Sequence, residues 1–487
     1  MVTRAPEDGS REGPMRTNAS RRGTNWRWVC GGAIAAGAAI TATVATAGRT
    51  VANERPTDRL LFSNPSGVHA TFTTAGSFDL NNPFFQSLGT NGRMCVTCHR
   101  PAEGWTVTPA ELQLRFQTTG GTDPIFTTND GSNCEGASAS TIEERQNAFS
   151  LLLTRGLIRV GLSVPSNAEF TVIDVDDPYH CGAPFSEVSM YRRPLPTTNL
   201  RFLSAVMWDG RETFHGQSVR DDLAHQALDA TLGHAQGAPP TDEQLKEIVD
   251  FETSLFTAQT QDRSAGSLTA AGATGGPVAL STQPFCVGVN DPFGILPAVP
   301  DACATPSTGL NPVVFTVFDA WQQAIPPARR AIARGETIFD TRPFVIDHVP
   351  GLNGGPQDPV AGPLQGTCTT CHNTPNAGDH SIAMPLNVGI ADASRRTPDL
   401  PLYTLQNRTT GETIQTTDPG RAMVTGRWVD IGKFKGPILR GLAARAPYFH
   451  NGSAASLAAV VDFYDTRFNL GLTAQEKADL IAFLSAL

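Results

Sequence analysis

The sequence has no excess of basic residues and no long leucine-rich segment. Lysine and arginine number 37 against 46 aspartate and glutamate residues, which gives a formal net charge of −9. An acidic chain is a poor partner for nucleic acid or anionic membranes, and it suits a basic redox protein better. The uncharged run from Trp28 to Ala47 is rich in alanine and glycine, so it makes a poor permanent membrane span.

That uncharged run has the features of an export signal. Arg21, Arg22 and Arg27 precede it, and Ala45-Thr46-Ala47 fits a cleavage site with small residues. Residues 1–47 are therefore predicted to be a signal peptide, and the mature protein is predicted to be periplasmic. An uncleaved membrane anchor is the alternative.

Cysteine is scarce, with nine residues, and its spacing is informative. Cys30 lies in the predicted signal, and four more form two C-x-x-C-H motifs. The remaining four are an even set, which predicts two disulfides in an oxidising compartment. The simplest of three arrangements pairs nearest neighbours, Cys134 with Cys181 and Cys286 with Cys303.

The C-x-x-C-H motif is typical of haem c attachment, because two thiols add to the haem vinyl groups while the histidine binds iron. The alternatives are a thioredoxin-type dithiol, expected after a strand in a βαβ unit, and half of a zinc site. Two motifs in separate repeats of an exported chain favour two covalently bound haems. The predicted attachment residues are Cys95, Cys98, Cys368 and Cys371, with His99 and His372 as proximal iron ligands.

The two halves of the chain repeat one another. After each motif come a Leu-Arg pair, a turn with an aromatic residue and glycine, and a capped amphipathic helix, TDEQLKEIVDF in the first half and TAQEKADLIAFL in the second. Such a repeat indicates duplicated units. The fold is predicted to be mainly α, with two tandem cytochrome c-like haem domains and long loop insertions.

The domain boundaries are predicted from these repeats. The N-terminal haem domain is placed at residues 48–261, with a loop-rich insertion at about 110–195. A linker with a disulfide loop is expected at 262–327, because it begins with a Gly/Ala/Ser-rich stretch. The C-terminal haem domain is placed at 328–487.

Several segments resemble bacterial di-haem cytochrome c peroxidases and their relative MauG. They are MWDGRE (207–212), LAHQA (223–227), KGPILRGLAARAPYFHNG (435–452) and VVDFY (460–464). The resemblance covers roughly residues 82–109, 194–256 and 328–487, and it omits the insertion. It implies hydrogen peroxide as substrate and a small cytochrome c or cupredoxin as electron donor.

The resemblance also implies that the two haems differ in their sixth iron ligand. In the family, one position of the C-terminal domain supplies it, as Met in the peroxidases and Tyr in MauG. That position is Tyr464 here, seven residues after Leu457, while seven residues after Leu223 lies Ala230. Tyrosine can bind ferric iron and alanine cannot, so a closed second haem and an open first haem are expected. Met423 is a competing ligand, and a half-buried aromatic residue is the alternative reading of Tyr464.

Cleavage of peroxide needs a group that moves a proton between the two oxygens. The family uses a glutamate ten residues after a glutamine, and counting from Gln226 gives Gln236, whose amide cannot do acid–base work. His234 is the candidate substitute, with an exposed loop histidine as the alternative. The family's distal histidine position is Arg115 here, so a mobile sixth ligand does not carry over.

Trp208 matches the tryptophan that lies between the haems in the family, although a tryptophan packed in a domain interface would give the same pattern. The family also binds calcium between its domains, but the calcium-binding asparagine aligns with Pro194. A calcium site is therefore unproven.

Three functions fit these observations. The first is a hydrogen peroxide reductase fed by a small redox protein. The second is a MauG-like enzyme that uses peroxide to oxidise a partner protein or an organic substrate, and the third is an electron carrier without catalysis. Rubber-cleaving di-haem oxygenases share the architecture and are a minor alternative. The oligomeric state is left open.

Overall fold

The fold combines helices with four small β-sheets. A computed structural model describes residues 57–294 and 297–487, so the predicted signal peptide lies outside the described part. Helices hold 30% and strands 17% of the described residues, and the sheets have four, three, two and two strands. The prediction of a mainly α fold is therefore wrong. Strands such as β8 (Phe344–Ile346) are too short to give a clear alternating pattern in the sequence.

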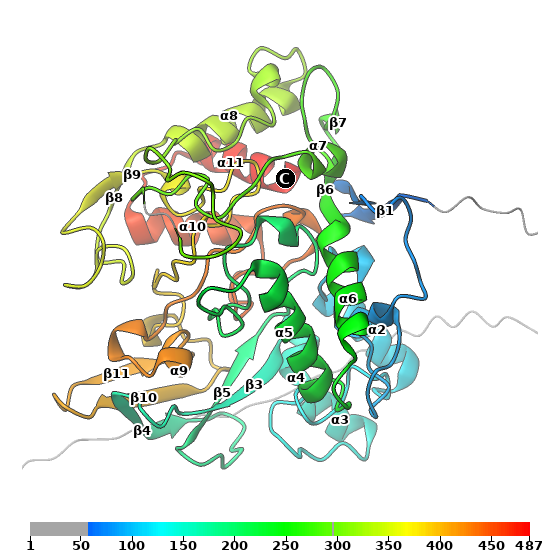
Figure 1. The fold of residues 1–487 in the computed structure, drawn as a ribbon, viewed down its shortest axis with the longest axis vertical. Coiled ribbons are helices and arrows are strands. Elements are labelled where there is room, and N and C mark those ends of the chain that lie inside the picture. The colour runs from blue at the N-terminus through cyan, green and yellow to red at the C-terminus, as the bar shows by residue number, and fades with distance from the viewer. Residues whose placement is uncertain (1–56, 295–296) are drawn as a thin grey trace, which may run out of the picture. The chain divides into compact units, whose positions relative to one another are not determined.

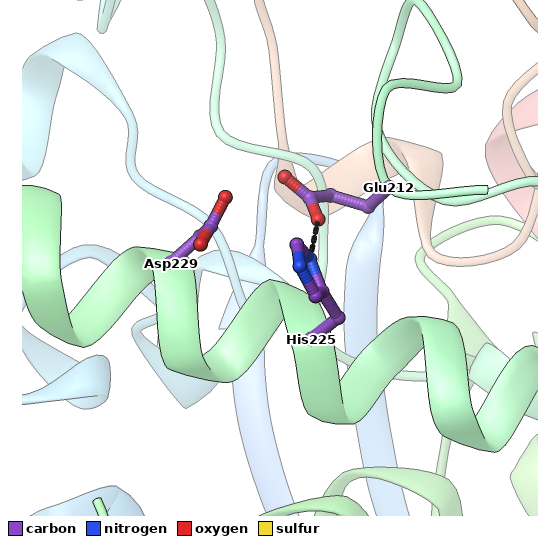
Figure 2. Close-up of side chains that lie close together, drawn as sticks. All are labelled: Glu212, His225 and Asp229. Atoms are coloured by element: carbon purple, nitrogen blue, oxygen red, sulfur yellow. Dashed lines mark hydrogen bonds and ion pairs between the residues drawn. The ribbon is translucent and has the colours of Figure 1, made fainter. Parts of the chain in front are cut away.

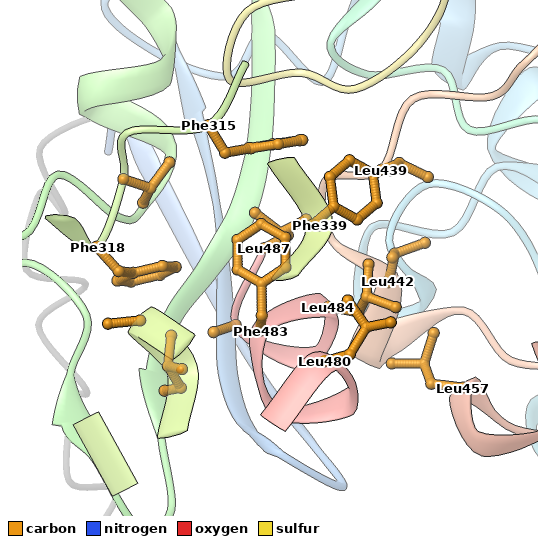
Figure 3. Close-up of a cluster of buried hydrophobic side chains, with 14 of the residues drawn as sticks. Phe315, Phe318, Phe339, Leu439, Leu442, Leu457, Leu480, Phe483, Leu484 and Leu487 are labelled. Atoms are coloured by element: carbon orange, nitrogen blue, oxygen red, sulfur yellow. The ribbon is translucent and has the colours of Figure 1, made fainter. Parts of the chain in front are cut away.

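The second half of the chain is built on three helices around an aromatic core. Figure 1 shows α8 beside α11, with α10 below them. Figure 3 shows Phe315, Phe339 and Phe483 meeting within this core. The close approach of α8 and α11 requires Gly335, where an added Cβ would lie 2.0 Å from the Asp479 carbonyl oxygen. The three helices are α8 (Pro327–Thr341), α10 (Leu457–Phe468) and α11 (Ala474–Ala486).

The helices of the first half are the short α1 (Cys95–Cys98), which holds the first motif, and the longer α5 (Val219–Gly233) and α6 (Asp242–Ser254), which pack against each other. Ser218 and Thr241 cap the two longer helices, each accepting a hydrogen bond from a backbone N–H three residues on. Both helices begin at a capping-box pattern that is readable in the sequence, Ser218-x-x-Asp221 and Thr241-x-x-Gln244.

Strand β6 follows α6 without a break and belongs to a four-stranded sheet with the order β1-β2-β6-β7. The segment after it, predicted as a linker, has Ala265, Leu268 and Ala273 buried in the core of the second half. The strands are β1 (Arg59–Asn64), β2 (Gly67–Thr73), β6 (Leu255–Asp262) and β7 (Gly266–Ser267).

The insertion is not a set of loops. Its strands β3 and β5 pair with each other, while β4 pairs with β10 of the second half, which in turn pairs with β11. The expectation of a long loop insertion is thus corrected, because its apolar residues pack against a sheet shared with the second half. The elements are α2 (Pro109–Thr119), α3 (Ile142–Ala148), α4 (Ser150–Arg155), β3 (Ile158–Ser163), β4 (Phe170–Asp176), β5 (Glu187–Arg192), β10 (Leu402–Asn407) and β11 (Thr413–Thr416).

The remaining elements are short. They are α7 (Pro277–Ser281), α9 (Ala422–Thr425), β9 (Leu364–Gly366) and the 3-10 helices Pro83–Phe85, Pro101–Glu103, Leu200–Phe202, Asp319–Trp321, Cys368–Thr370, Ala393–Arg395, Trp428–Asp430 and Leu442–Ala444. The described residues form one compact unit, and the division into two haem domains and a linker stays a prediction.

The two predicted disulfides are confirmed. Cys134 is bonded to Cys181, and Cys286 is bonded to Cys303. Among the described residues, no helix combines the length and the hydrophobicity needed to cross a membrane.

Candidate functional site

The first C-x-x-C-H motif forms α1, and His99 follows directly. The Nδ1–H of His99 donates to the Trp105 carbonyl at 3.1 Å, which leaves Nε2 as the nitrogen available to a metal. Burial lowers the pKa of His99 to about 4, so its imidazole is neutral. Metal-binding histidines commonly show this arrangement, in which a backbone carbonyl fixes the tautomer.

The second motif repeats the same device. The Nδ1–H of His372 donates to the Gly378 carbonyl at 2.6 Å, and burial lowers the pKa of His372. None of the four motif cysteines is in a disulfide, so all four thiols are available to form thioether bonds. Both histidines therefore present a neutral Nε2.

Each motif faces its own cavity, and the two helices predicted to be equivalent line them. The first cavity is lined by His99 and by Leu223 and Ala230 of α5. The second is lined by His372 and by Leu457 and Tyr464 of α10. The seven-residue spacing read from the repeat thus places Ala230 and Tyr464 at matching points of the two cavities.

The Tyr464 hydroxyl makes no hydrogen bond to another described residue. Burial, with Cys371 and Cys368 nearby, raises the pKa of Tyr464, so the phenol keeps its proton unless a cation meets it. The competing candidate Met423 is elsewhere, buried among Phe170 and Tyr403 beside the three-stranded sheet. The geometry favours Tyr464 over Met423, although iron binding by Tyr464 stays a prediction.

Of the predicted acid–base candidates, Gln226 and His234 line the first cavity. Gln236 is exposed, and its backbone carbonyl accepts a hydrogen bond from Thr90 Oγ1 at 3.0 Å. Arg115 also lies outside the cavity lining, because Asp123 holds its guanidinium. The structure therefore brings His234, and not Gln236, to the cavity.

Asp130 is a cavity residue that the sequence analysis missed. The Nδ1–H of His234 donates to Asp130 Oδ2 at 2.5 Å, and Arg93 Nη1 donates to Oδ1 at 2.5 Å. Burial opposes ionisation of Asp130, but the hydrogen bonds and charges of His234 and Arg93 outweigh it and lower its pKa. Asp130 comes from the insertion and has no distinctive sequence pattern, so only the structure identifies it.

Trp208 lines both cavities, as does Pro194. Its Nε1–H donates to the Arg193 carbonyl at 2.8 Å, and its ring lies 6.2 Å from the ring of His450. The Pro194 carbonyl accepts a hydrogen bond from Thr106 Oγ1 at 2.7 Å, so this oxygen has a protein partner. Trp208 therefore belongs to the wall that the two cavities share, and its place between two haems stays a prediction.

The first cavity also contains unpaired cationic donors. Nε and Nη2 of Arg440 and Nε of Arg445 are buried without a hydrogen-bond partner, and burial lowers the pKa of both guanidiniums to about 10. Buried arginine donors are expected to meet an anion. The carboxylates of a haem would supply one, so the residues fit haem c: free thiols, neutral histidines, apolar walls and unpaired arginines.

A polar cluster fixes the position of α5. Figure 2 shows Glu212, from the MWDGRE segment, accepting the His225 Nδ1–H, with Asp229 one turn further along the helix. The hydrogen bond that His225 donates to Glu212 raises the pKa of His225. The ligand atoms of all three lie within 4.8 Å of one another, but the ion pair alone accounts for the arrangement. It ties α5, which carries Gln226, to the turn that carries Trp208.

Comparison with known proteins relates part of this chain to peroxidases. It is 37% identical over 140 residues to cytochrome-c peroxidase IdrP1 of Pseudomonas sp. (strain SCT), which covers 25% of this chain and 36% of that protein. Cytochrome-c peroxidase IdrP2 of Denitromonas iodatirespirans is 35% identical over 133 residues, with the same shares. Each match spans about a third of the relative's length. The similarity confirms the resemblance to bacterial cytochrome c peroxidases.

No model of a protein family matches the chain. Among solved structures, a MauG-like protein associated with microbial copper homeostasis covers 83% of this chain and 86% of its own, at 16% identity and a TM-score of 0.37. Kuenenia stuttgartiensis hydrazine synthase covers 78% of this chain and 93% of its own, at 13% identity and a TM-score of 0.29. Scores this low carry no argument about fold or function.

Proposed function

Since part of the chain is related to bacterial cytochrome c peroxidases, we propose that it is a periplasmic di-haem oxidoreductase that reduces hydrogen peroxide. Two electrons from a small cytochrome c or cupredoxin, with two protons, would convert peroxide to two water molecules. The observation that supports this best is the unequal pair of cavities. Ala230 has no side chain that could bind iron, whereas Tyr464 occupies the matching point of the other cavity.

Two covalently bound haems would be held by the two motifs. Cys95 and Cys98 would bind the first, with His99 on iron, and Cys368 and Cys371 the second, with His372 on iron. When bound, haem c would supply the iron that binds peroxide and the means to accept and store electrons. Arg440 and Arg445 would pair with the carboxylates of the first haem.

His234 is the proposed acid–base group of the first cavity. Its Nδ1 is committed to Asp130, so Nε2 is the atom that would take a proton from one peroxide oxygen and return it to the other. Asp130 would fix this tautomer and stabilise the imidazolium that forms. Gln226, one helical turn before Ala230, lines the same cavity and would orient peroxide through its amide.

Trp208 is the proposed electron bridge. It lines both cavities, and its indole N–H is held by the Arg193 carbonyl. A fixed aromatic ring between two redox groups would shorten the gap that an electron must cross. Trp208 would thereby carry the second electron from the second cavity to the first.

A MauG-like oxidation of a partner protein is the second candidate. Tyr464 favours it, because MauG has tyrosine at this position and the peroxidases have methionine. An electron carrier without catalysis is the third. The three functions make different demands on peroxide reactivity.

Electron paramagnetic resonance of the oxidised protein, followed by rapid mixing with peroxide, separates them. A high-spin signal from the first haem and reaction with peroxide without prior reduction are expected. Turnover with a reduced small cytochrome supports the reductase, and oxidation of a protein substrate instead supports the MauG-like function. No reaction in any redox state would contradict both and leave the electron carrier.

A further inference from the structure

Glu252, on α6, is a carboxyl group without a partner in the first cavity. Only 4% of the residue is exposed, and it lines the cavity together with His99. Its Oε2 is buried without a hydrogen bond, and no described cation forms an ion pair with it. A buried carboxyl left unpaired is costly, so its presence in the lining calls for an explanation.

The repeat shows that this carboxyl is specific to the first cavity. Counting from the helix caps Thr241 and Thr473, Glu252 matches Leu484 of α11. Leu484 lines the second cavity at the corresponding place. The same helix position is therefore ionisable beside the first haem site and apolar beside the second.

We propose that Glu252 is a proton-binding site coupled to reduction of the first haem. One electron added to the iron would be accompanied by one proton from solvent, which forms an O–H bond on the Glu252 carboxylate. No other bond changes. The coupling arises because oxidised iron carries one more positive charge, which favours the carboxylate, and reduction removes that charge in a site where water cannot screen it.

The surroundings of Glu252 support this assignment. Burial alone raises its pKa to about 8, so without a nearby positive charge it is mostly protonated at neutral pH. Glu252 acts on Cys95 of α1, whose own pKa is raised by burial and then by Glu252. Bonding of haem to this thiol would remove it as a titrating group.

The charged groups on the elements packed against α6 do not contribute to the pKa shift of Glu252, whose only cause is burial. The buried carboxylate of α5, Asp222, accepts the Phe214 N–H. The 3-10 helix Pro83–Phe85 has no ionisable side chain. On α5, Arg220 is bonded to Asp250, and on the 3-10 helix Leu200–Phe202, Arg201 is exposed. The cations Arg440 and Arg445 of the cavity wall do not shift the Glu252 carboxyl, and haem carboxylates would neutralise them.

The test is a redox titration of the haem-loaded protein, followed by absorption from about pH 6 to about pH 9. One of the two haem waves should fall by about 59 mV for each tenfold fall in proton concentration, the value for one proton per electron. In Glu252→Gln and in Glu252→Leu, which installs the residue of the second cavity, that wave should lose its slope. Asp250→Asn, an exposed carboxylate on the same helix, should retain it.

A slope that persists in Glu252→Gln would overturn the proposal. If these variants do not fold, the infrared difference spectrum of the unaltered protein decides, since reduction should create a protonated carboxyl band that shifts in heavy water. Absence of that band would equally overturn it. The proposal rests on haem binding at the first motif and needs no peroxide. A protein that shows the slope but does not reduce peroxide would support Glu252 and contradict the proposed function.

Discussion

The two cavities share one backbone plan and differ in the side chains that fill it. In each half, a helix after the repeated turn (α5 or α10) lines the cavity wall, and a capped helix (α6 or α11) closes the unit. The turns correspond in detail, because Met207 and Phe449 have the same φ of 67° and Gly210 and Gly452 follow them with φ of 67° and 63°. The repeat is therefore structural as well as sequential.

The side chains of the two cavities differ at three equivalent positions. Gln226, Ala230 and Glu252 of the first cavity stand where the second has Val460, Tyr464 and Leu484. At these three positions the first cavity thus has one ionisable group, Glu252, whereas the second has two apolar side chains and one phenol. A duplicated scaffold can assign proton chemistry to one copy and electron storage to the other through a few substitutions.

The turns between the cavities differ in charge. Asp209 and Asn451 occupy equivalent positions, and each side chain accepts the backbone N–H two residues on. Only Asp209 also accepts a hydrogen bond from Arg192, which is buried and bonded to Asp418 as well. Asp209 is thereby anchored by a buried ion-pair network, whereas the neutral side chain of Asn451 forms no ion pair.

The largest expected effect is loss of one haem. Replacing both motif cysteines by alanine, in either motif, removes both thioether bonds of that site, so the intact mass should fall by one haem relative to a protein with two. Mass spectrometry checks this. Alanine at Cys286 and Cys303 is the control, because that disulfide lies outside both motifs, and a wild-type mass with one haem would contradict two sites.

Replacing His234 with glutamine should lower peroxide reduction by about 10²- to 10⁴-fold, the usual contribution of a positioned acid–base group. Cyanide binding to the oxidised protein should be unchanged, since the iron remains accessible. Gln236→Ala is the matched control, because Gln236 is exposed. Steady-state and stopped-flow rates measure the effect, and equal activity of both variants would exclude His234.

Replacing Asp209 with asparagine gives the first turn the residue of the second. The backbone hydrogen bond should survive, but Arg192 loses a buried partner, which should lower the free energy of unfolding by about 3–5 kcal/mol. Asn451→Asp tests the reverse exchange, and it should not stabilise the protein. Denaturant unfolding measures both changes, and an unchanged midpoint for Asp209→Asn would contradict the role of the network.

The acid stability of the protein should depend on Asp209. Burial opposes its ionisation, but Arg192 and Arg211 hold its pKa at about 2, below its ordinary value. A lowered pKa contributes stability above the unfolded-state pKa of about 4, and this contribution is lost as the pH falls towards about 2. Thermal unfolding across this range should be less pH-dependent in Asp209→Asn than in the wild type.

The smallest expected effect is spectral. Replacing Tyr464 with phenylalanine should change only the signal of the second haem, because Ala230 stands at the matching point of the first. Met423→Leu should leave the spectrum unchanged, since Met423 lies in a separate core. If Met423→Leu alters the second haem and Tyr464→Phe does not, the register argument is wrong.

The sequence carried the local features of the sites. Features that depend on nearby residues and on helical periodicity could be read directly. They are the motifs, the helix caps Ser218 and Thr241, and the spacing that relates Ala230 to Tyr464. Asp130 could not, because its contact with His234 spans 104 residues. Glu252 was readable as a helix residue, but only the packing shows that it is buried in a cavity wall.

The sheets were missed for a similar reason. Strand β4 pairs with β10, which places Val172 opposite Leu405 across a long stretch of chain. Such pairing leaves no signal within either short segment. The disulfides could be predicted because an even number of cysteines limits the arrangements, whereas backbone pairing has no such count.

The pairing of β4 with β10 sets a condition on dissecting the protein. A fragment ending near residue 261 would lack Leu402–Asn407. The backbone groups of Phe170–Asp176, a strand that already exposes Ile173, would therefore be left unpaired. An uncovered strand edge is a template for pairing with other chains. The isolated first half should consequently aggregate, so the properties of one haem are better isolated by point variants in the full chain than by cutting it.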